Sequence, residues 1–455
     1  MKFLYTPCFG LLGLALLGSA ANAAGSSTSA PRQKSEGGSK LTPVERPALA
    51  VTPTGEHAIA PRVAALAGGG YVLAWSVRAG GGFDLFTQRH DASGRTIGEP
   101  GRLRTSGTSS VLHTAVAGLA SGGHVLAWTR MEPKGPVVEV QSYGADGHPV
   151  GAPRRAHANP LSGQVEPEVV ALSDGGYVVG WMSTSRQPPR FGIQARRFGA
   201  DATPDGPEIT VAATDYFMNH RRVSMAALPN AGFVLAWSSL GQDGSGYGVF
   251  ARQYDGRGEA VAGQQRVNTT WLADQFHPAV TGLADGGYVI TWIQRGLSAS
   301  IHAQRFLPGG VRAGEEMRVD EPPSGARESA SDSGGGSAKD AFAAPVSPAV
   351  ARVPDGGFVI SWSALGLAGD ALLARRFDQG GRPMGSPARV RSPASGGQRL
   401  PALAPLDDSQ LVLAWTFSVA GRAQPAAWGL YTQRLRTSGR PYTSIPLAPT
   451  RKSAT

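Results

Sequence analysis

Four polar side chains stand at one equivalent position in successive repeats of the sequence: His113, Glu166, Arg222 and His277. Imidazole, carboxylate and guanidinium groups can together bind a polar ligand, and two histidines with one glutamate can hold a metal ion. The other repeats have Ala60, Ser347 and Leu400 at this position. Two interpretations stay open: a polar site around the mouth of a central channel, or a set of solvated loop residues.

Aromatic residues outside the repeat pattern form a second candidate for ligand binding. Tyr216 and Phe217 lie beside the basic run from His220 to Arg222, and Trp271 precedes the following repeat. Aromatic rings near Arg and His suit stacking against a sugar or a peptide side chain, although they could also pack loops onto the domain. The predicted ligand-binding residues are therefore Tyr216, Phe217, Arg222, Trp271, His277, His113 and Glu166.

Sequence signatures of catalysis are missing. We find no nucleophile elbow, no H-E-x-x-H and no phosphate-binding loop. Acidic residues are too scattered to indicate a glycosidase pair. Asp243 to Ser245 resembles a fragment of a calcium loop but lacks the acidic partners that such a site needs. We therefore predict no catalytic residue, no metal site and no cofactor.

The elements that position these residues are copies of one motif, as in Gly286-Gly287-Tyr288-Val289-Ile290-Thr291-Trp292. Six of the seven copies have an aromatic residue or His after the second glycine. A period near fifty residues indicates a repeat architecture. The copies end at Trp75, Trp128, Trp181, Trp237, Trp292, Trp362 and Trp415.

Each repeat contains four short apolar runs separated by Asp-Gly turns, which predicts one four-stranded antiparallel sheet per repeat. The second run, as in Tyr71 to Trp75, is apolar on both alternating faces, so both faces must be covered. Sheets stacked radially meet this need, and we predict an all-β, seven-bladed β-propeller. A linear array of β-sandwiches would need more strands per repeat. A solenoid would need parallel coils.

The expected boundaries follow from the repeats. A signal peptide over 1–23 and a flexible linker over 24–46 precede a propeller over 47–447, and a tail follows over 448–455. Residues 47–54 resemble a fourth strand and should close the ring on the last blade. A Gly/Ser-rich insertion over 321–346 is expected to be disordered. The blades are expected near 60–111, 113–165, 166–219, 222–275, 277–320, 347–398 and 400–447.

An even number of strands returns the chain to the same face after each blade. The turns between strands one and two and between three and four share one face, and these turns are uniform. The other face carries connections of variable length, and variable loops on a rigid scaffold commonly bind ligands. The third run repeats an arginine, which we expect to stack on a Trp or to hold an Asp-Gly turn: Arg89, Arg197, Arg305, Arg376 and Arg434.

The first residues indicate export. An apolar run after Lys2 ends at Ala21-Asn22-Ala23, a signal-peptidase pattern. The single cysteine, Cys8, lies within this segment, so the mature chain would have no disulfide. The net charge of +10 is spread through all repeats. We expect an exported monomer, periplasmic or extracellular, with no membrane span and no nucleic-acid partner.

The fourth and fifth repeats resemble a known family. Gly232 to Ser239, Gly241 to Ala251 and Arg266 to Thr270 are similar to tandem repeats of large secreted bacterial surface proteins of the adhesin type. The resemblance implies export and a display or binding role, and it supplies no catalytic residues. The sequence thus predicts a non-catalytic binding or scaffold propeller for a glycan or protein ligand. The alternative is a secreted polysaccharide hydrolase or lyase acting at the channel mouth.

Overall fold

The computed structural model describes most of the chain from Leu41 to Thr437, which belongs to the unit Gly38–Thr455. The other unit, Met1–Gly37, lies outside the described residues. The described ranges are 41–43, 58–79, 82–103, 110–158, 163–184, 191–213, 220–296, 298–320, 345–364, 370–390, 396–407, 409–419 and 428–437. No helix in these ranges is long and apolar enough to cross a membrane.

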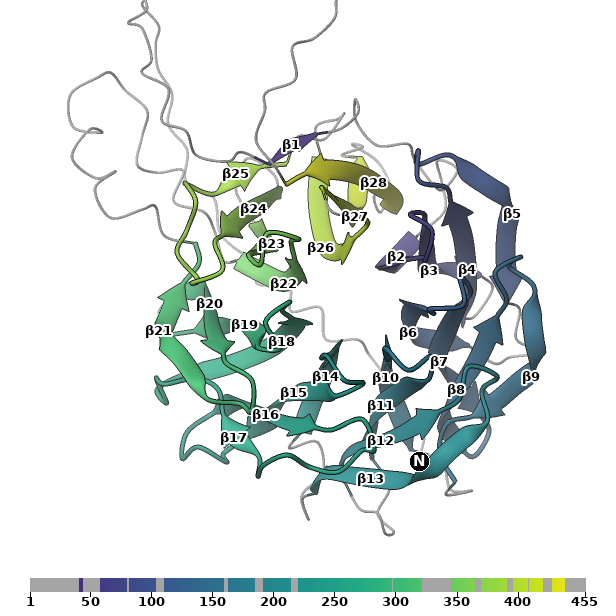
Figure 1. Ribbon diagram of the computed structural model, residues 1–455, viewed down its shortest axis with the longest axis horizontal. Coiled ribbons are helices and arrows are strands. Elements are labelled where there is room, and N and C mark those ends of the chain that lie inside the picture. The colour runs from purple at the N-terminus through teal and green to yellow at the C-terminus, as the bar shows by residue number, and fades with distance from the viewer. Residues whose placement is uncertain are drawn as a thin grey trace, which may run out of the picture. The chain divides into compact units, whose positions relative to one another are not determined.

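The described strands form seven four-stranded antiparallel sheets around one axis, which confirms the predicted β-propeller (Figure 1). Blades one to three contain β2(Ala58–Ala65) to β5(Thr96–Leu103), β6(Val111–Gly118) to β9(Pro149–Arg155), and β10(Gln164–Ala171) to β13(Pro204–Ala213). Blades four to six contain β14(His220–Ala227) to β17(Gln265–Arg266), β18(Asp274–Gly282) to β21(Arg312–Arg318), and β22(Pro345–Arg352) to β25(Ala388–Arg389).

The seventh blade combines both ends of the propeller. It contains β26(Gly396–Pro405), β27(Gln410–Val419) and β28(Trp428–Arg436), with β1(Thr42–Pro43) paired to the outer edge of β28. The closing segment therefore comes from the stretch that we expected to be linker. Leu41 packs against the apolar core between blades six and seven, which provides a reason for closure at this point. The expected closing strand, 47–54, lies outside the described residues.

The hydrophobic core lies between the blades. Seven of the buried clusters each join residues of two neighbouring blades, and one of these joins blade seven to blade one. All seven repeat tryptophans are buried in these interfaces, as predicted. Such packing means that each blade is stabilised by its two neighbours.

The motif residues have identifiable packing roles. In six blades the aromatic or His side chain that begins the second strand stacks on an aromatic or His side chain that ends the third, as Tyr288 does on Phe306. Gly286 has φ of 85°, and a Cβ on Gly287 would lie 2.3 Å from the carbonyl oxygen of Phe306. The paired glycines are therefore required by backbone geometry.

The repeated arginines hold turns. Arg197, Arg305 and Arg376 each pair with the aspartate of a turn between strands one and two of their own blade: Asp174, Asp285 and Asp355. Arg89 instead donates to the carbonyl oxygen of Ala145 in blade two. Arg434 makes the equivalent bond from blade seven to Ala92 of blade one. The prediction that these arginines anchor turns is confirmed for these residues.

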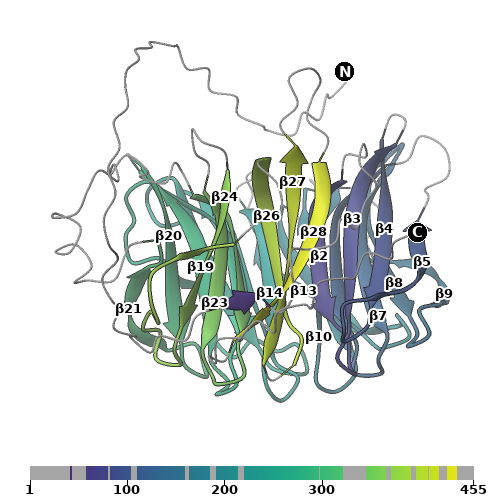
Figure 2. The same cartoon turned by 90° about the horizontal axis from the view of Figure 1, so that it is seen from above.

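We call the side with these short turns the turn face and the opposite side the loop face. In Figure 2, β27 runs upward from the turn face to the loop face. The insertion over 321–346 lies outside the described residues except for its last two positions, which belong to β22. The end of the expected last blade, 438–447, also lies outside them.

Candidate functional site

A bulge interrupts the innermost strand of every blade close to its loop-face end. The register against the second strand shifts at the same point in β2, β6, β10, β14, β18, β22 and β26. The first bulge residue is always a non-glycine residue with positive φ, between 46° and 56°. These residues are Ala60, His113, Glu166, Arg222, His277, Ser347 and Leu400, the ring predicted from the sequence.

Left-handed backbone at a non-glycine residue is unfavourable and persists only where the surrounding structure imposes it. Because all seven blades share the bulge, the fold determines its backbone geometry, whichever side chain stands there. The side chains at this position are what differ from blade to blade. The ring therefore presents variable chemistry on a constant backbone, as a binding site requires.

Charged groups interact on one side of this ring. Glu166 and Arg222 influence the ionisation of His113, as does Arg62 from blade one. Arg62 donates a hydrogen bond of 3.2 Å to Glu168, which lies in β10, two residues beyond Glu166. We call Arg62, His113, Glu166, Glu168 and Arg222 the axial cluster. It joins blades one to four.

The axial cluster has perturbed ionisation. Burial raises the pKa of the Glu168 carboxyl, and the guanidinium groups of Arg62 and Arg222 oppose that shift. Burial also lowers the pKa of Arg222, and the positive charge of Arg62 adds to the effect. Partial burial lowers the pKa of His113; Glu166 opposes the shift, and both arginines reinforce it.

These directions leave His113 neutral near pH 7, in the field of the Glu166 carboxylate and of the Arg62 and Arg222 guanidinium groups. Such a set can bind a polar ligand that carries both hydroxyl and acidic groups. The open alternative of a metal site on His113, Glu166 and His277 finds no support. Among the described residues, no three His, Cys, Asp or Glu side chains are grouped so that they could hold an ion.

Trp271 lies on the connection from blade four to blade five and is strongly exposed. Its relative exposure is 52%, and that of the neighbouring Leu272 is 62%. The same chain segment continues through Phe276 to His277, whose rings meet edge to face. Arg295 covers the ring of Phe276 at 4.8 Å. One segment thus connects an exposed aromatic residue to the ring of bulges.

A buried amide network fixes the loop that carries Trp271. Asn268 and Gln275 are fully buried and bonded to each other at 2.9 Å. Asn268 donates to the carbonyl of Thr270, and Gln275 donates to the carbonyls of Leu272 and Ala273. The carbonyls of three residues next to Trp271 therefore each accept a hydrogen bond from a buried amide. We call residues 268–275 the Trp271 loop.

Both sides of the Trp271 loop are anchored as well. On one side, the carboxylate of Asp274 accepts the backbone N–H of Tyr247 from the hairpin of blade four. On the other side, Glu316 accepts the backbone N–H and the hydroxyl of Thr269. The exposure of Trp271 is thus a property of a fixed loop, and an aromatic ring held in this way loses little entropy on binding.

Two predicted residues cannot be placed. Tyr216 and Phe217 lie outside the described residues, so their part in the site stays a prediction. His277 occupies the bulge of blade five, one blade beyond Arg222.

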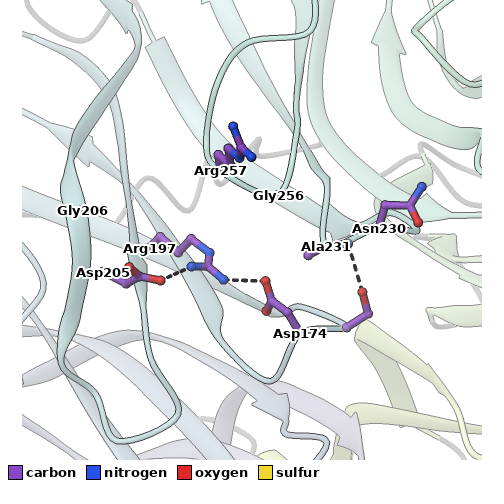
Figure 3. Close-up of a pocket in the computed structure, with 9 residues that line it drawn as sticks. Asp174, Arg197, Asp205, Gly206, Asn230, Ala231, Gly256 and Arg257 are labelled. Atoms are coloured by element: carbon purple, nitrogen blue, oxygen red, sulfur yellow. Dashed lines mark hydrogen bonds and ion pairs between the residues drawn. The ribbon is translucent and has the colours of Figure 1, made fainter.

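A cleft lies on the turn face, where the sequence predicted little shape. Its volume is about 680 Å³, and its lining joins blades three and four (Figure 3). Arg197 points between Asp174 and Asp205 and pairs with both. In blade four the turn contains Asn230 at the position of Asp174 and Asp285, and Ala231 in place of the first glycine, both with φ of 59°. The turns of this face, which the sequence indicated to be uniform, therefore differ in blade four.

The cleft is nevertheless a weaker candidate than the loop face. Its charged pair, Arg197 with Asp174, recurs in blades five and six as a turn anchor. A contact that the fold repeats has a structural reason to exist. The axial cluster and the amide network do not recur in this way.

Sequence reasoning missed Arg62, Glu168, Asn268 and Gln275. The sequence did contain a signal for Arg62 and Glu168. The equivalent positions of the other blades, two residues beyond the bulge, hold Ala115, Ser224, Ala279, Ala349 and Ala402. A charged residue at a position otherwise restricted to small side chains marks a local function or a local ion pair. No comparable signal identified the two amides, whose importance depends on the path of the loop.

Comparison with known proteins supports the fold. No family model and no curated protein matches the sequence. A protein of unknown function from Dyadobacter fermentans DSM 18053 is 13% identical, with a TM-score of 0.51 over 87% of this chain and 99% of that one. An ulvan lyase of polysaccharide lyase family PL25 is 9% identical, with a TM-score of 0.52 over 83% and 93%.

The NanB sialidase from Streptococcus pneumoniae is 12% identical, with a TM-score of 0.48 over 87% of this chain and 71% of that one. At these identities the likeness shows the fold alone. The chain is a seven-bladed β-propeller, and its function has to be argued from its own residues.

Proposed function

We propose that this protein is an exported binding or scaffold propeller whose ligand docks on the loop face at blades four and five. The observation that carries the proposal is the Trp271 loop, where an exposed aromatic residue stands on a fully buried amide network. An exposed ring fixed in this manner is poorly explained by stability and well explained by recognition. The signal-peptide pattern and the resemblance to secreted surface repeats favour export.

A glycan is the ligand class that fits this surface best. A sugar ring stacks on Trp271 through its apolar face, while its hydroxyl and acidic groups suit the His277 ring position and the axial cluster. A protein ligand would use the same Trp271 and Leu272 as apolar anchors. The two classes differ in how much apolar surface they require.

The test is a glycan and peptide array with the purified chain, followed by calorimetry on each hit. Trp271→Ala should weaken binding by about 2 kcal/mol, roughly thirty-fold, because a central stacking residue is removed. Its effect on unfolding should stay within about 0.5 kcal/mol. Val311→Ala is the matched control, since Val311 is 61% exposed on the turn face. Equal binding by both variants would exclude the Trp271 loop as the ligand site.

A polysaccharide hydrolase or lyase is the second candidate, favoured by the raised pKa of Glu168 in the same cluster as the neutral His113. A carboxyl group with a raised pKa is suited to act as a general acid, and a neutral imidazole can act as a base. Incubation with a panel of acidic and neutral polysaccharides should then release reducing ends or unsaturated products. Glu168→Gln should abolish that release if the axial cluster is catalytic. Turnover that survives this substitution would refute the assignment.

A further inference from the structure

Three side chains in blade five form a continuous hydrogen-bonded chain outside the axial cluster. The hydroxyl oxygen of Ser300 lies 3.0 Å from Nε2 of His302, and both residues belong to β20(Ala299–Phe306). Nδ1 of His302 lies 2.7 Å from a carboxylate oxygen of Glu316 in β21. Serine, histidine and carboxylate joined in this order are the arrangement that activates a serine for acyl transfer.

The surroundings of Glu316 determine where the protons lie. Burial opposes ionisation of Glu316, but hydrogen bonds from His302 and from Thr269 outweigh it and lower the pKa of the carboxyl group. An ionised Glu316 accepts a hydrogen bond from Nδ1–H of His302, which leaves the lone pair on Nε2. Nε2 can then accept the hydroxyl proton of Ser300. Thr269 holds the second carboxylate oxygen, so the orientation of Glu316 is fixed.

The fold does not require this chain of residues. His302 lies opposite the repeat tryptophan, and Ser300 lies opposite the residue two positions later. The other six blades place Phe86, Glu139, Gln194, Phe250, Leu373 and Tyr431 opposite the tryptophan. Opposite the later residue they place Asp84, Val137, Gly192, Gly248, Ala371 and Gly429. The combination of Ser and His therefore occurs in blade five alone.

The burial of Ser300 limits the size of the substrate group that can reach its hydroxyl. Ser300 is 8% exposed and is the second residue of β20, next to the loop-face connection that contains the exposed Ser298. The Trp271 loop is tied to the same group of residues through Thr269 and Glu316. Only a small acyl group can approach a hydroxyl in this position, whereas the alcohol portion of an ester can extend over the loop face.

We propose that Ser300 is the nucleophile of an acyl-transfer site for small acyl esters, with His302 as general base and Glu316 as the positioning residue. Ser300 Oγ attacks the ester carbonyl as its proton moves to Nε2 of His302. The C–O bond to the alcohol breaks, and the alcohol leaves with that proton. Water then attacks the acyl-serine, with His302 again accepting a proton, and releases the acid and free Ser300.

The experiment uses the full chain and two probes, a biotinylated fluorophosphonate and p-nitrophenyl acetate. We expect covalent labelling at Ser300, located by peptide mass spectrometry, and a burst of p-nitrophenol equal to the protein concentration. Peptide mapping of the wild-type protein needs no variant, so a folding defect cannot obscure the result. A wild-type chain that is not labelled at Ser300 overturns the proposal.

Four substitutions sharpen this result. Ser300→Ala should abolish labelling and the burst, whereas Ser298→Ala, the exposed neighbouring serine, should change neither. Glu316→Gln should slow labelling by about 100-fold, as expected when a general base loses its orientation. Trp271→Ala should leave labelling intact even if it removes glycan binding, so the two proposals fail separately. If Glu316→Gln lowers only the melting temperature while its labelling rate equals that of the wild type, Glu316 is an anchor and the proposed triad is refuted.

Discussion

The turn face and the loop face at blades four and five use polar residues in different ways. On the turn face, an arginine in the third strand pairs with a turn aspartate in three blades. At the Trp271 loop, by contrast, Asn268 and Gln275 form a buried amide pair and Asp274 accepts the N–H of Tyr247, an arrangement that the described residues show in one place. Because the seven repeats provide an internal comparison, repetition separates contacts that the fold needs from contacts that need another explanation.

The largest expected effect concerns a residue that all repeats share. Trp237→Ala should destabilise the protein by about 3–5 kcal/mol, because a buried indole is removed from the interface of blades three and four. Neighbouring blades share that interface, so the unfolding transition in urea should also broaden. An unchanged midpoint would mean that the repeated tryptophan does not stabilise the blade interface.

The next largest effect on stability is expected at the position that begins the second strand of each blade, where blade two has His124. His124 stacks on Tyr143, and burial lowers its pKa from 6.5 to about 4. A folded-state pKa below the unfolded value stabilises the protein above pH 6.5, and this stabilisation is lost as the pH falls toward 4. His124→Phe should remove that loss, a gain of about 3 kcal/mol near pH 4.

The measurement is the urea midpoint of the wild type and of His124→Phe between pH 4 and pH 7. The exposed His148 in the next turn of the same blade provides the control, as His148→Gln should leave the pH dependence unchanged. The same acid sensitivity in all three proteins would show that other groups dominate acid unfolding, since burial also lowers the pKa of His90 and His220 to about 4.

A third test removes one member of the buried amide network under the Trp271 loop. Asn268→Ala leaves Gln275 and the N–H of Val249 without their buried partner, so we expect a loss of about 2 kcal/mol. Hydrogen exchange should rise in residues 270–274, because their carbonyl anchors are weakened. The exposed Gln242 is the control, and Gln242→Ala should have no effect on either quantity. Unchanged exchange would show that the amides do not fix the Trp271 loop.

The smallest effect should come from the turn face. Asp285→Ala removes the ion pair with Arg305 and the bond from the N–H of Gly287, at a cost of about 1 kcal/mol. Ligand binding and labelling of Ser300 should both be unaffected, because the change lies at the opposite end of blade five. Loss of ligand binding in this variant would contradict the division of roles between the two faces.

The fold was predictable because its determinants are periodic. The spacing of the tryptophans gave the number of blades, and the double glycines gave the turns. The ring of bulge residues was also located correctly, although its positive φ was not foreseen. The residues under Trp271 could not be identified in this way, because a buried amide is recognised only by the carbonyls that it reaches.

Ring closure shows another limit of pattern matching. Residues 47–54 resemble a fourth strand in sequence, yet the described pairing uses Thr42–Pro43, with Leu41 packed on the core. A two-residue strand has too few side chains to produce a recognisable pattern. Its position depends on an apolar contact formed only in the folded ring.

The bond from Arg434 to the carbonyl of Ala92 has a wider consequence. It reproduces between the last and first blades the contact that Arg89 makes between blades one and two. The junction between blade seven and blade one is thus built like the junctions between blades adjacent in sequence, with its own buried cluster and its own arginine bond. The closing interface therefore has the same kinds of contact as the internal interfaces. We expect the stability of an interface between blades to depend on these contacts and not on its place in the sequence.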